Sequence, residues 1–315
     1  MKYILIIIII LFLLIKFYNL PKINNFSNIN NVKLYNNEYL KHFNNLDYKL
    51  RNCNKDICLN KYNNFYLNFT NNEKNKIKKI THNINLVINR FFYKNIFKFK
   101  FLKVKNSMEK SLPHTRESYV ILSEKWFDKI FNINNILEDS FYFKLFFHEI
   151  FHIFQRNNPN LINILYKYYW NLIKFNKKIP IKIKNIIRTN PDALPNNNWL
   201  FKINNDKYIL PLCIYLNNSV NITNTKNVYY ELDKNLEFIN INKYYDLFDL
   251  KNYSDYFGIN NSNNYHPNEL SSSIFENIMY NLYNNLDDEN NLGYKKLKEF
   301  LIKYCYLKKF DNIIQ

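Results

Sequence analysis

The chain has 315 residues, of which 47% are hydrophobic, so it is long enough to bury one large core or two modest ones. Its formal net charge of +18 would suit a nucleic acid, but the lysines are scattered and form no arginine-rich stripe or nucleic-acid motif. The composition is rich in Asn, Ile, Lys and Tyr, with only 2 Gly, which is typical of AT-rich coding sequence. We therefore expect a solvated basic surface and no specific nucleic-acid partner.

Residues 1–20 predict an N-terminal membrane anchor. An unbroken apolar run from Tyr3 to Ile15 lies between Lys2 and Lys16, and no small-residue cleavage site follows it. The run itself is shorter than the roughly 20 residues of a membrane span, but the aromatic residues after it extend it. We expect a single-pass signal-anchor, with secretion after signal cleavage as the alternative. Either route delivers the bulk of the chain across a membrane.

Residues 21–70 are polar and Asn-rich, and we interpret them as a stalk followed by an N-terminal helical segment, with a helix near residues 38–49. The chain has four cysteines: Cys53, Cys58, Cys213 and Cys305. An even number suits an oxidising compartment with up to two disulfides, and Cys53 and Cys58 are spaced to close a small loop. Four free thiols are the alternative, and the spacing does not decide between them.

Residues 71–315 are predicted to form one catalytic domain. Its first element is a packing helix over 72–93, where apolar residues recur at helical spacing. Strict alternation over Phe97–Phe101 then predicts a half-buried strand, and the apolar run Ser118–Ser123 predicts another. The segment His114–Arg116 stands just before that second strand. His114 or Arg116 could stabilise the carbonyl oxygen of a reacting bond, and an ordinary polar turn is the alternative.

The helix predicted over residues 139–156 contains the motif His148-Glu149-Ile150-Phe151-His152. Residues four apart share one face of a helix, so the imidazoles of His148 and His152 can bind one zinc ion. Glu149 lies about 100° round the helix, where its carboxylate can take a proton from a zinc-activated water. Two satisfied core histidines are the alternative. The helix is apolar nearly all round, so burying these polar residues without a role would cost about 1–3 kcal/mol each.

The segments after this helix predict a second helix and a β-rich insertion. Pro159 suits the first turn of a helix running to about residue 176. Asp192 could orient a ligand histidine or pair with Arg156, or it could belong to a simple Asn-Pro-Asp turn. Residues 198–264 are predicted to be an irregular β-rich insertion, with strands at 199–203, 208–216 and 228–232 and a loop at 246–264.

A helix is predicted from Pro267, and it offers a third metal ligand. Glu269 in its first turn is the preferred ligand, His266 is second, and Glu276 is the fallback. Glu269 could instead only offset the helix dipole. The last segment, residues 293–311, is predicted to be an amphipathic packing helix.

At the H-E-x-x-H motif the chain resembles the zincin metallopeptidases, and with a downstream helical Glu it is similar to their gluzincin branch. The metzincin extension of the motif is absent, and Ser273 stands where the gluzincin branch usually has an Asp. The resemblance implies Zn²⁺ held by His148, His152 and Glu269, with Glu149 as general base. It also implies an α+β fold: a small mixed β-sheet packed on the active-site helix, followed by a mostly helical C-terminal half that carries the β-rich insertion.

We therefore predict a membrane-anchored zinc metallopeptidase that hydrolyses a peptide or protein substrate. The oxyanion would be held by the metal together with one nearby side chain, from the set His114, Arg116, Tyr265 and His266. A catalytically silent zincin-fold surface or structural binding protein is the alternative. The intact Glu149 favours the enzyme, because a structural zinc site has no use for a carboxylate beside its water.

Overall fold

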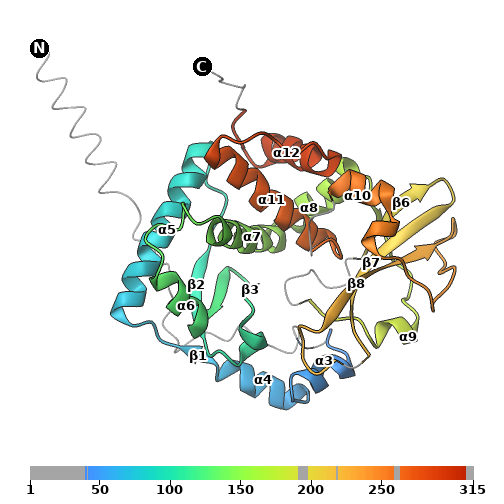
Figure 1. Cartoon of the computed structure of the whole chain (residues 1–315), viewed down its shortest axis with the longest axis horizontal. Helices are drawn as coiled ribbons and strands as arrows, with labels where there is room; N and C mark the ends of the chain where they lie inside the picture. Colours follow the sequence, from blue (N-terminus) through green and yellow to red (C-terminus); the bar gives the residue numbers. More distant parts are fainter. Residues whose placement is uncertain (1–39, 41, 191–197, 218, 259–262, 310–315) are drawn as a thin grey trace, which may run out of the picture.

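The computed structural model describes residues 40, 42–190, 198–217, 219–258 and 263–309 (Figure 1). The anchor predicted over residues 1–20, most of the predicted stalk and Asp192 lie outside these ranges. Within the described ranges, no helix is both long enough and apolar enough to cross a membrane.

Two four-stranded sheets are present in the described residues. The first has the order β1-β2-β4-β3, in which β2 and β4 are parallel and the other pairs are antiparallel. Its strands are β1 (Tyr66–Leu67), β2 (Lys100–Val104), β3 (His114–Arg116) and β4 (Tyr119–Ser123). The second is antiparallel throughout, in the order β5 (Ile173–Lys174), β6 (Trp199–Asn204), β7 (Lys207–Tyr215) and β8 (Thr225–Leu232).

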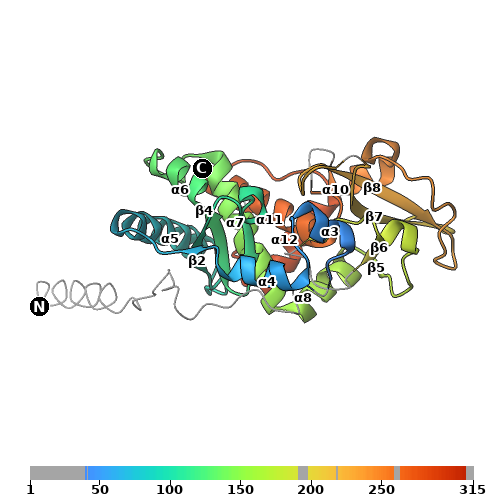
Figure 2. The same ribbon diagram turned by 90° about the horizontal axis from the view of Figure 1, so that it is seen from below.

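Helices separate the two sheets and cover them. They are α3 (Asn45–Leu50), α4 (Lys55–Asn63), α5 (Asn71–Phe91), α6 (Glu124–Phe131), α7 (Ser140–Asn157), α8 (Pro159–Ile164), α9 (Ile181–Lys184), α10 (Lys251–Phe257), α11 (Pro267–Asn284) and α12 (Leu292–Tyr304). In both views α5 lies at one end of the molecule and β6–β8 lie at the other, with α7 and α11 between them (Figures 1 and 2). The fold is therefore a mixture of helices and strands with one mixed and one antiparallel sheet.

Aromatic packing holds α7 in the centre of the main core. Phe151 of α7 stacks on Phe275 of α11 with ring centroids 4.4 Å apart, and Phe101 of β2 meets Phe146 edge-on at 5.7 Å. All four side chains are fully buried. Such aromatic pairs add about 0.5–1.5 kcal/mol each beyond the apolar area they bury. The helix is therefore fixed on one side by the mixed sheet and on another by α11.

Several elements form where the sequence predicts them. The predicted helices over 72–93, 139–156, from Pro267 and near the C-terminus correspond to α5, α7, α11 and α12. The strand predicted at Ser118–Ser123 is β4, and the three strands of the predicted insertion are β6, β7 and β8. The periodic apolar patterns thus identified the long elements correctly.

Three local predictions were wrong. The alternating stretch Phe97–Phe101 pairs as a strand only from Lys100, although Phe97 and Phe99 are buried. The helix begun at Pro159 ends in a π-turn over Leu165–Tyr169, and Asn171 follows with a left-handed φ of 52°. The loop predicted at 246–264 contains α10, because Tyr253 and Phe257 pack on Phe201.

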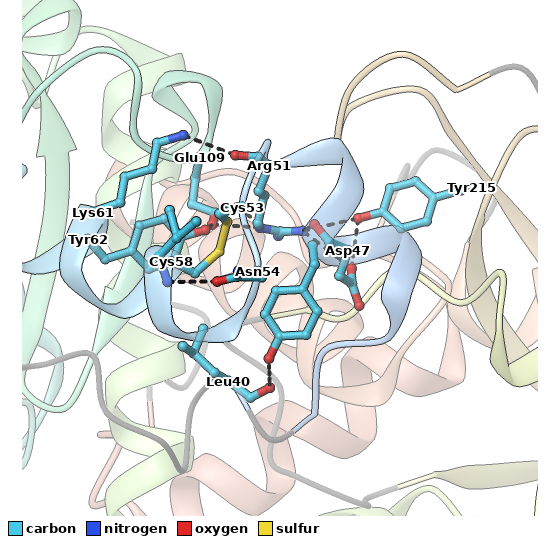
Figure 3. Close-up of a disulfide and its surroundings, with 12 residues drawn as sticks. Leu40, Asp47, Arg51, Cys53, Asn54, Cys58, Lys61, Tyr62, Glu109 and Tyr215 are labelled. Atoms are coloured by element: carbon cyan, nitrogen blue, oxygen red, sulfur yellow. Dashed lines mark hydrogen bonds and ion pairs between the residues drawn. A yellow bond between two sulfur atoms is a disulfide. The ribbon is translucent and has the colours of Figure 1, made fainter.

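A buried ion network ties the N-terminal segment to both sheets (Figure 3). The Arg51 guanidinium donates to both carboxylate oxygens of Glu109, at 3.0 and 2.9 Å, and lies 3.3 Å from Asp47 Oδ1. Tyr62 donates to Glu109, and Tyr215 of β7 donates to Asp47 at 2.8 Å. β1 pairs with β2, so this segment joins the mixed sheet across the boundary predicted at residue 70.

Two of the four cysteines are bonded to each other. Cys53 and Cys58 form a disulfide beside the Arg51 network, with Cα atoms 5.2 Å apart (Figure 3). Cys213 and Cys305 are free and buried. The chain therefore has one short disulfide loop and two core thiols.

Candidate metal centre

Helix α7 begins at a well-defined cap. The carboxylate of Asp139 accepts hydrogen bonds from the backbone N–H groups of Phe141 and Tyr142, at 3.0 and 3.1 Å. From that start the helix runs without interruption to Asn157, and its apolar side chains pack into the core on most sides. Phe141 is the exception, since it is 57% exposed. The cap fixes where the helix begins, and packing against α11 turns His148 and His152 toward Glu269.

Helices α7 and α11 pack antiparallel along the site. Contacts between them run in opposite directions: Phe143 meets Tyr280 near one end, and Gln155 meets Asn268 near the other. The first two turns of α11 carry five buried polar residues, and three of them are small serines: Asn268, Glu269, Ser271, Ser272 and Ser273. Small residues let the two helices approach closely enough for side chains of one to reach the imidazoles of the other.

The three predicted ligands converge. The Nε2 atoms of His148 and His152 lie 3.1 Å apart. Glu269 places one carboxylate oxygen 3.4 Å from Nε2 of His148 and the other 3.3 Å from Nε2 of His152. All three side chains are buried, and one ligand atom from each lies within 4.8 Å of the others. Two residues on α7 and one on α11, 117 positions further along the chain from His152, thus meet at one point.

Each imidazole also forms a hydrogen bond through Nδ1, the ring nitrogen that faces away from the shared point. Nδ1 of His148 donates to the Glu276 carboxylate at 2.9 Å, and Nδ1 of His152 donates to Oε1 of Gln155 at 2.9 Å. Since a proton on Nδ1 leaves the lone pair on Nε2 in a neutral ring, both histidines direct an acceptor at the shared point. Glu276 was the fallback third ligand, and the structure instead places it behind His148, where it orients the ring.

Gln155 is itself fixed by the facing helix. Its Nε2 donates to the Asn268 carbonyl and to the Ser271 hydroxyl, both at 2.8 Å, and to Ser272 at 3.2 Å. These bonds set the direction of the side-chain amide, so its oxygen faces His152. The sequence signal for this residue was its position three after His152, which places it one turn along the same helix.

Glu269 has a second polar neighbour from outside the two helices. Asn190 Nδ2 donates to a Glu269 carboxylate oxygen and, at 3.0 Å, to the Tyr265 hydroxyl. Asn190 belongs to the segment after α9, which the sequence singled out only for Asp192. The amide therefore links Glu269 to the loop that leads into α11.

The protonation of the metal-free cluster follows from its geometry. Burial by itself would lower the pKa of His148, but the hydrogen bonds and charges of Glu269 and Glu276 raise it well above 6.5. Burial would raise the pKa of Glu269, and the charge of His152 with the imidazole hydrogen bonds holds it well below 4.5. Without metal, a proton therefore occupies the histidine side of the cluster while Glu269 stays ionised.

A cavity of about 200 Å³ opens beside the cluster. It is lined by Glu109, Leu112, Pro113, His114, His148, Glu149, His152, Arg188, Asn190, Asn263, Tyr265 and Glu269. Glu149, at 5% exposure, is in this wall with the three converging residues. The chemistry-bearing residues of the motif thus face one shared space, as the H-E-x-x-H spacing predicts.

The predicted oxyanion residues separate into two groups. His114 and Tyr265 line the cavity, and Nδ1 of His114 donates to the Leu112 carbonyl at 3.0 Å. Arg116 and His266 are not among the lining residues. His266 instead caps α11, where its Nδ1 accepts from the Asn268 N–H at 3.1 Å. Its predicted roles as ligand or oxyanion donor are therefore not supported by its position.

Strand β3 forms the edge of the mixed sheet nearest the cluster. It pairs with β4 on one side only among the described residues, and α7 packs against it. Arg156 of α7 donates to the Thr115 hydroxyl at 2.9 Å and to the Glu117 carbonyl at 2.9 Å, which attaches the helix to this edge. Within the described residues β3 is thus the last strand on this side of the mixed sheet, and its residues His114 and Thr115 are buried.

Comparisons with known proteins give no assignment. No family model matches the chain, and no curated protein or solved structure matches it. The site is therefore interpreted from its own residues and geometry.

Proposed function

We propose that the chain is a zinc-dependent peptidase whose metal is held by His148, His152 and Glu269. The observation that carries this proposal is the convergence of these three side chains in a cavity that Glu149 also lines. The predicted anchor at residues 1–20 would place the activity at a membrane surface.

The donor set fits zinc. Two imidazole nitrogens and one carboxylate oxygen are a ligand set that catalytic zinc sites use, with a fourth position left for water or substrate. Atoms bound to a tetrahedral zinc ion at about 2.0–2.1 Å lie roughly 3.3 Å from one another. Here the two Nε2 atoms lie 3.1 Å apart, and Glu269 turns a different carboxylate oxygen to each of them, at 3.4 Å from His148 and 3.3 Å from His152. One ligand atom from each of the three residues lies within 4.8 Å of the others. The hydrogen bonds behind both rings supply the outer contacts that metal-bound histidines usually have.

A zinc ion in this position would polarise the substrate carbonyl and acidify the attacking water. In such a reaction Glu149 would accept a proton from a water in the cavity and pass it to the nitrogen of the leaving amine. Its burial at 5% exposure keeps bulk water away from the carboxylate, which suits a group that must hold and then release a proton. Glu276 and Gln155 keep the ligand rings in place while the proton moves.

Tyr265 is the better candidate of the two cavity residues for stabilising the oxyanion. It lines the cavity, and its hydroxyl accepts a hydrogen bond from Asn190, which also donates to Glu269, so the phenol is positioned beside the proposed metal site. The Nδ1 of His114 donates to the Leu112 carbonyl, a bond that holds the ring in the cavity wall. We therefore assign the oxyanion contact to Tyr265 and a supporting position to His114.

The alternative, a silent binding protein on the same scaffold, predicts a bound metal without turnover. The full chain, purified in detergent and loaded with zinc, is incubated with a mixed peptide library, and the products are read by mass spectrometry. We expect cleavage by the wild type, and a rate roughly 10²–10⁴ lower for Glu149→Gln with equal zinc content. Equal rates for the two proteins would contradict the proposal, and zinc binding without cleavage in either would favour the silent protein.

A further inference from the structure

Arg188 is a cation in the wall of the cavity that holds the proposed metal site, and the motif chemistry does not use it. The side chain is partly buried, and its Nε atom is enclosed without a hydrogen-bond partner. Within the described residues no carboxylate forms an ion pair with the guanidinium at 4.0 Å or less. An arginine stays charged under all ordinary conditions, and burying its charge without an opposite charge is costly.

The groups around the guanidinium do not supply that opposite charge. Its strongest electrostatic neighbours are Tyr265, Cys213, Tyr215 and Glu109. A phenol or thiol is neutral near pH 7, and burial raises the pKa of both Cys213 and Tyr215 further. Glu109 is the one acid among them, and Arg51 already engages both of its carboxylate oxygens.

The acid on the other side of the cavity is also engaged. Glu269 contacts both imidazoles and accepts a hydrogen bond from Asn190. The cavity therefore contains a cation whose nearby carboxylates already have partners. An anion entering the cavity would complete the pairing, and a carboxylate matches the planar, two-pronged donor set of a guanidinium.

The backbone attaches Arg188 to β7, so it enters the cavity wall from a different element than the motif residues do. Its N–H donates to the Cys213 carbonyl of β7 at 2.9 Å, and Ile187 pairs with Ile214 in an isolated bridge. The motif residues come from α7 instead. A substrate whose carbonyl lies at the metal would thus present a flanking group to Arg188. At about 200 Å³ the cavity is smaller than pockets for larger ligands, so it suits a single residue.

We propose that Arg188 binds a carboxylate on the substrate residue next to the reacting bond, which makes the site selective for an acidic group there. The inference rests on the proposed metal centre. The carboxylate is either the C-terminal α-carboxylate of a peptide, as an exopeptidase would require, or the side chain of an Asp or Glu. Arg188 is then a specificity-determining residue.

Isothermal titration calorimetry tests this proposal by comparing the affinities of three related ligands for the zinc-loaded full chain. Each is a malonyl monohydroxamate joined to one amino acid: leucine with a free carboxylate, leucine amide, or aspartic acid amide. We expect at least one charged ligand to bind roughly tenfold or more tightly than leucine amide. Preference for the free-acid leucine identifies an α-carboxylate, and preference for the aspartyl ligand identifies a side chain.

The variants make the assignment specific. Arg188→Gln should lose the preference for the charged ligand while keeping its zinc and its affinity for leucine amide. Arg188→Lys, which retains the charge, should keep part of the preference and guards against a general folding defect. Arg90→Gln, the same change at an exposed site on α5, should behave like wild type.

Two results would overturn the inference. Only one of them would also overturn the proposed zinc-dependent function. If leucine amide binds as tightly as both charged ligands, or if the preference survives in Arg188→Gln, only the carboxylate assignment fails. If the chain neither holds zinc nor binds any of the hydroxamates, the proposed function fails and the inference fails with it.

Discussion

The molecule contains two buried clusters of charged residues, and their difference separates a structural cluster from a candidate site. In the Arg51 cluster, one guanidinium contacts Glu109 and Asp47 (Figure 3). Tyrosine hydroxyls donate to both carboxylates, and Thr189 also donates to Asp47. In the α7–α11 cluster, two imidazole Nε2 atoms and one carboxylate converge from three directions. In the first cluster each charged group has an opposite charge beside it. In the second, three groups that accept hydrogen bonds or metal ions face one another.

The lesson is that burial of charge does not by itself indicate function. Both clusters contain a carboxylate whose pKa is lowered by nearby positive groups, namely Glu109 to about 2 and Glu269 well below 4.5. What distinguishes them is the direction of the lone pairs. Glu276 and Gln155 hold the Nδ1 protons of the two rings away from the centre, so both Nε2 atoms face the shared point, where a metal would replace the extra proton of the metal-free cluster.

The Arg51 cluster also supports a strained turn in the cavity wall. Glu109, Lys110 and Ser111 have left-handed φ values of 44°, 54° and 63° in succession. For a residue other than glycine, that conformation costs about 1–2 kcal/mol. The bonds from Arg51 and Tyr62 hold Glu109 in place at the start of this turn, and the turn leads directly into β3. The structural cluster therefore positions one wall of the candidate site.

The largest effect on stability should come from breaking the structural cluster. Glu109→Gln leaves the Arg51 charge buried without its main partner, so we expect the free energy of unfolding to fall by about 3 kcal/mol. Urea denaturation followed by circular dichroism measures this. A matched change at the exposed Glu299 should alter the stability by less than about 0.5 kcal/mol. A loss at Glu109 no larger than at Glu299 would show that the cluster does not stabilise the fold.

Acid titration checks the same cluster independently. Burial alone would raise the pKa of Glu109, but the Arg51 charge and hydrogen bonds lower it from 4.5 to about 2. The folded pKa lies below the unfolded one, so its stabilisation is full above pH 4.5 and is lost as the pH falls toward about 2. The wild type should lose stability over that range more steeply than Glu109→Gln. Parallel curves would contradict the role of Glu109.

The next largest effect should be on zinc affinity, through the orientation of His148. Glu276→Gln keeps the shape of the side chain but removes the charge that faces His148. Loss of such an outer partner typically weakens metal binding about 10–100-fold. Competition with a zinc chelator measures the affinity, and Glu299→Gln serves as the control. An affinity equal to that of the wild type would mean that Glu276 does not orient the ligand.

The affinity for zinc should also depend on pH. The pKa of His148 is raised well above 6.5 in the metal-free cluster, so zinc must displace a proton to bind. Below that raised pKa, the zinc affinity should fall about tenfold for each unit by which the pH decreases. Calorimetry in buffers of different ionisation enthalpy counts the released protons. Release of no proton near neutral pH would contradict a protonated histidine in the metal-free cluster.

The smallest effect is expected at Ser273. The gluzincin branch usually has an Asp at this position, but here the serine hydroxyl lies 3.5 Å from Nδ1 of His148, farther than the Glu276 carboxylate at 2.9 Å. Ser273→Ala should therefore change zinc affinity by no more than about threefold. A loss as large as that of Glu276→Gln would transfer the orienting role to Ser273.

Sequence reasoning was strongest where chemistry depends on local spacing. The positions of His148, Glu149 and His152 on one helix follow from the H-E-x-x-H motif alone, and α7 has nearly its predicted bounds. The pattern also identified α11, on which Glu269 is the predicted third ligand. Convergence of Glu269 on the two histidines, however, depends on how α7 and α11 pack, and no local pattern encodes that packing.

Contacts between residues far apart in the chain, and short helices, could not be predicted from the sequence. Arg51 and Glu109 are separated by 58 positions, and nothing near either residue indicates the other. Arg188 lines the cavity only because its backbone bonds to β7. α10 was missed because its surroundings are Asn- and Ser-rich, and its helical state depends on packing against Phe201. Tertiary contacts determine each of these features.

The most direct test of the metal centre is the zinc content of the purified full chain. Wild type, His152→Ala, Glu269→Ala and the exposed control Glu299→Ala are loaded with zinc, dialysed and analysed by atomic spectroscopy, with circular dichroism confirming that each is folded. We predict close to one zinc per chain in the wild type and the control, and a large loss in both ligand variants. Zinc absent from the wild type, or retained in Glu269→Ala, would contradict the three-residue centre.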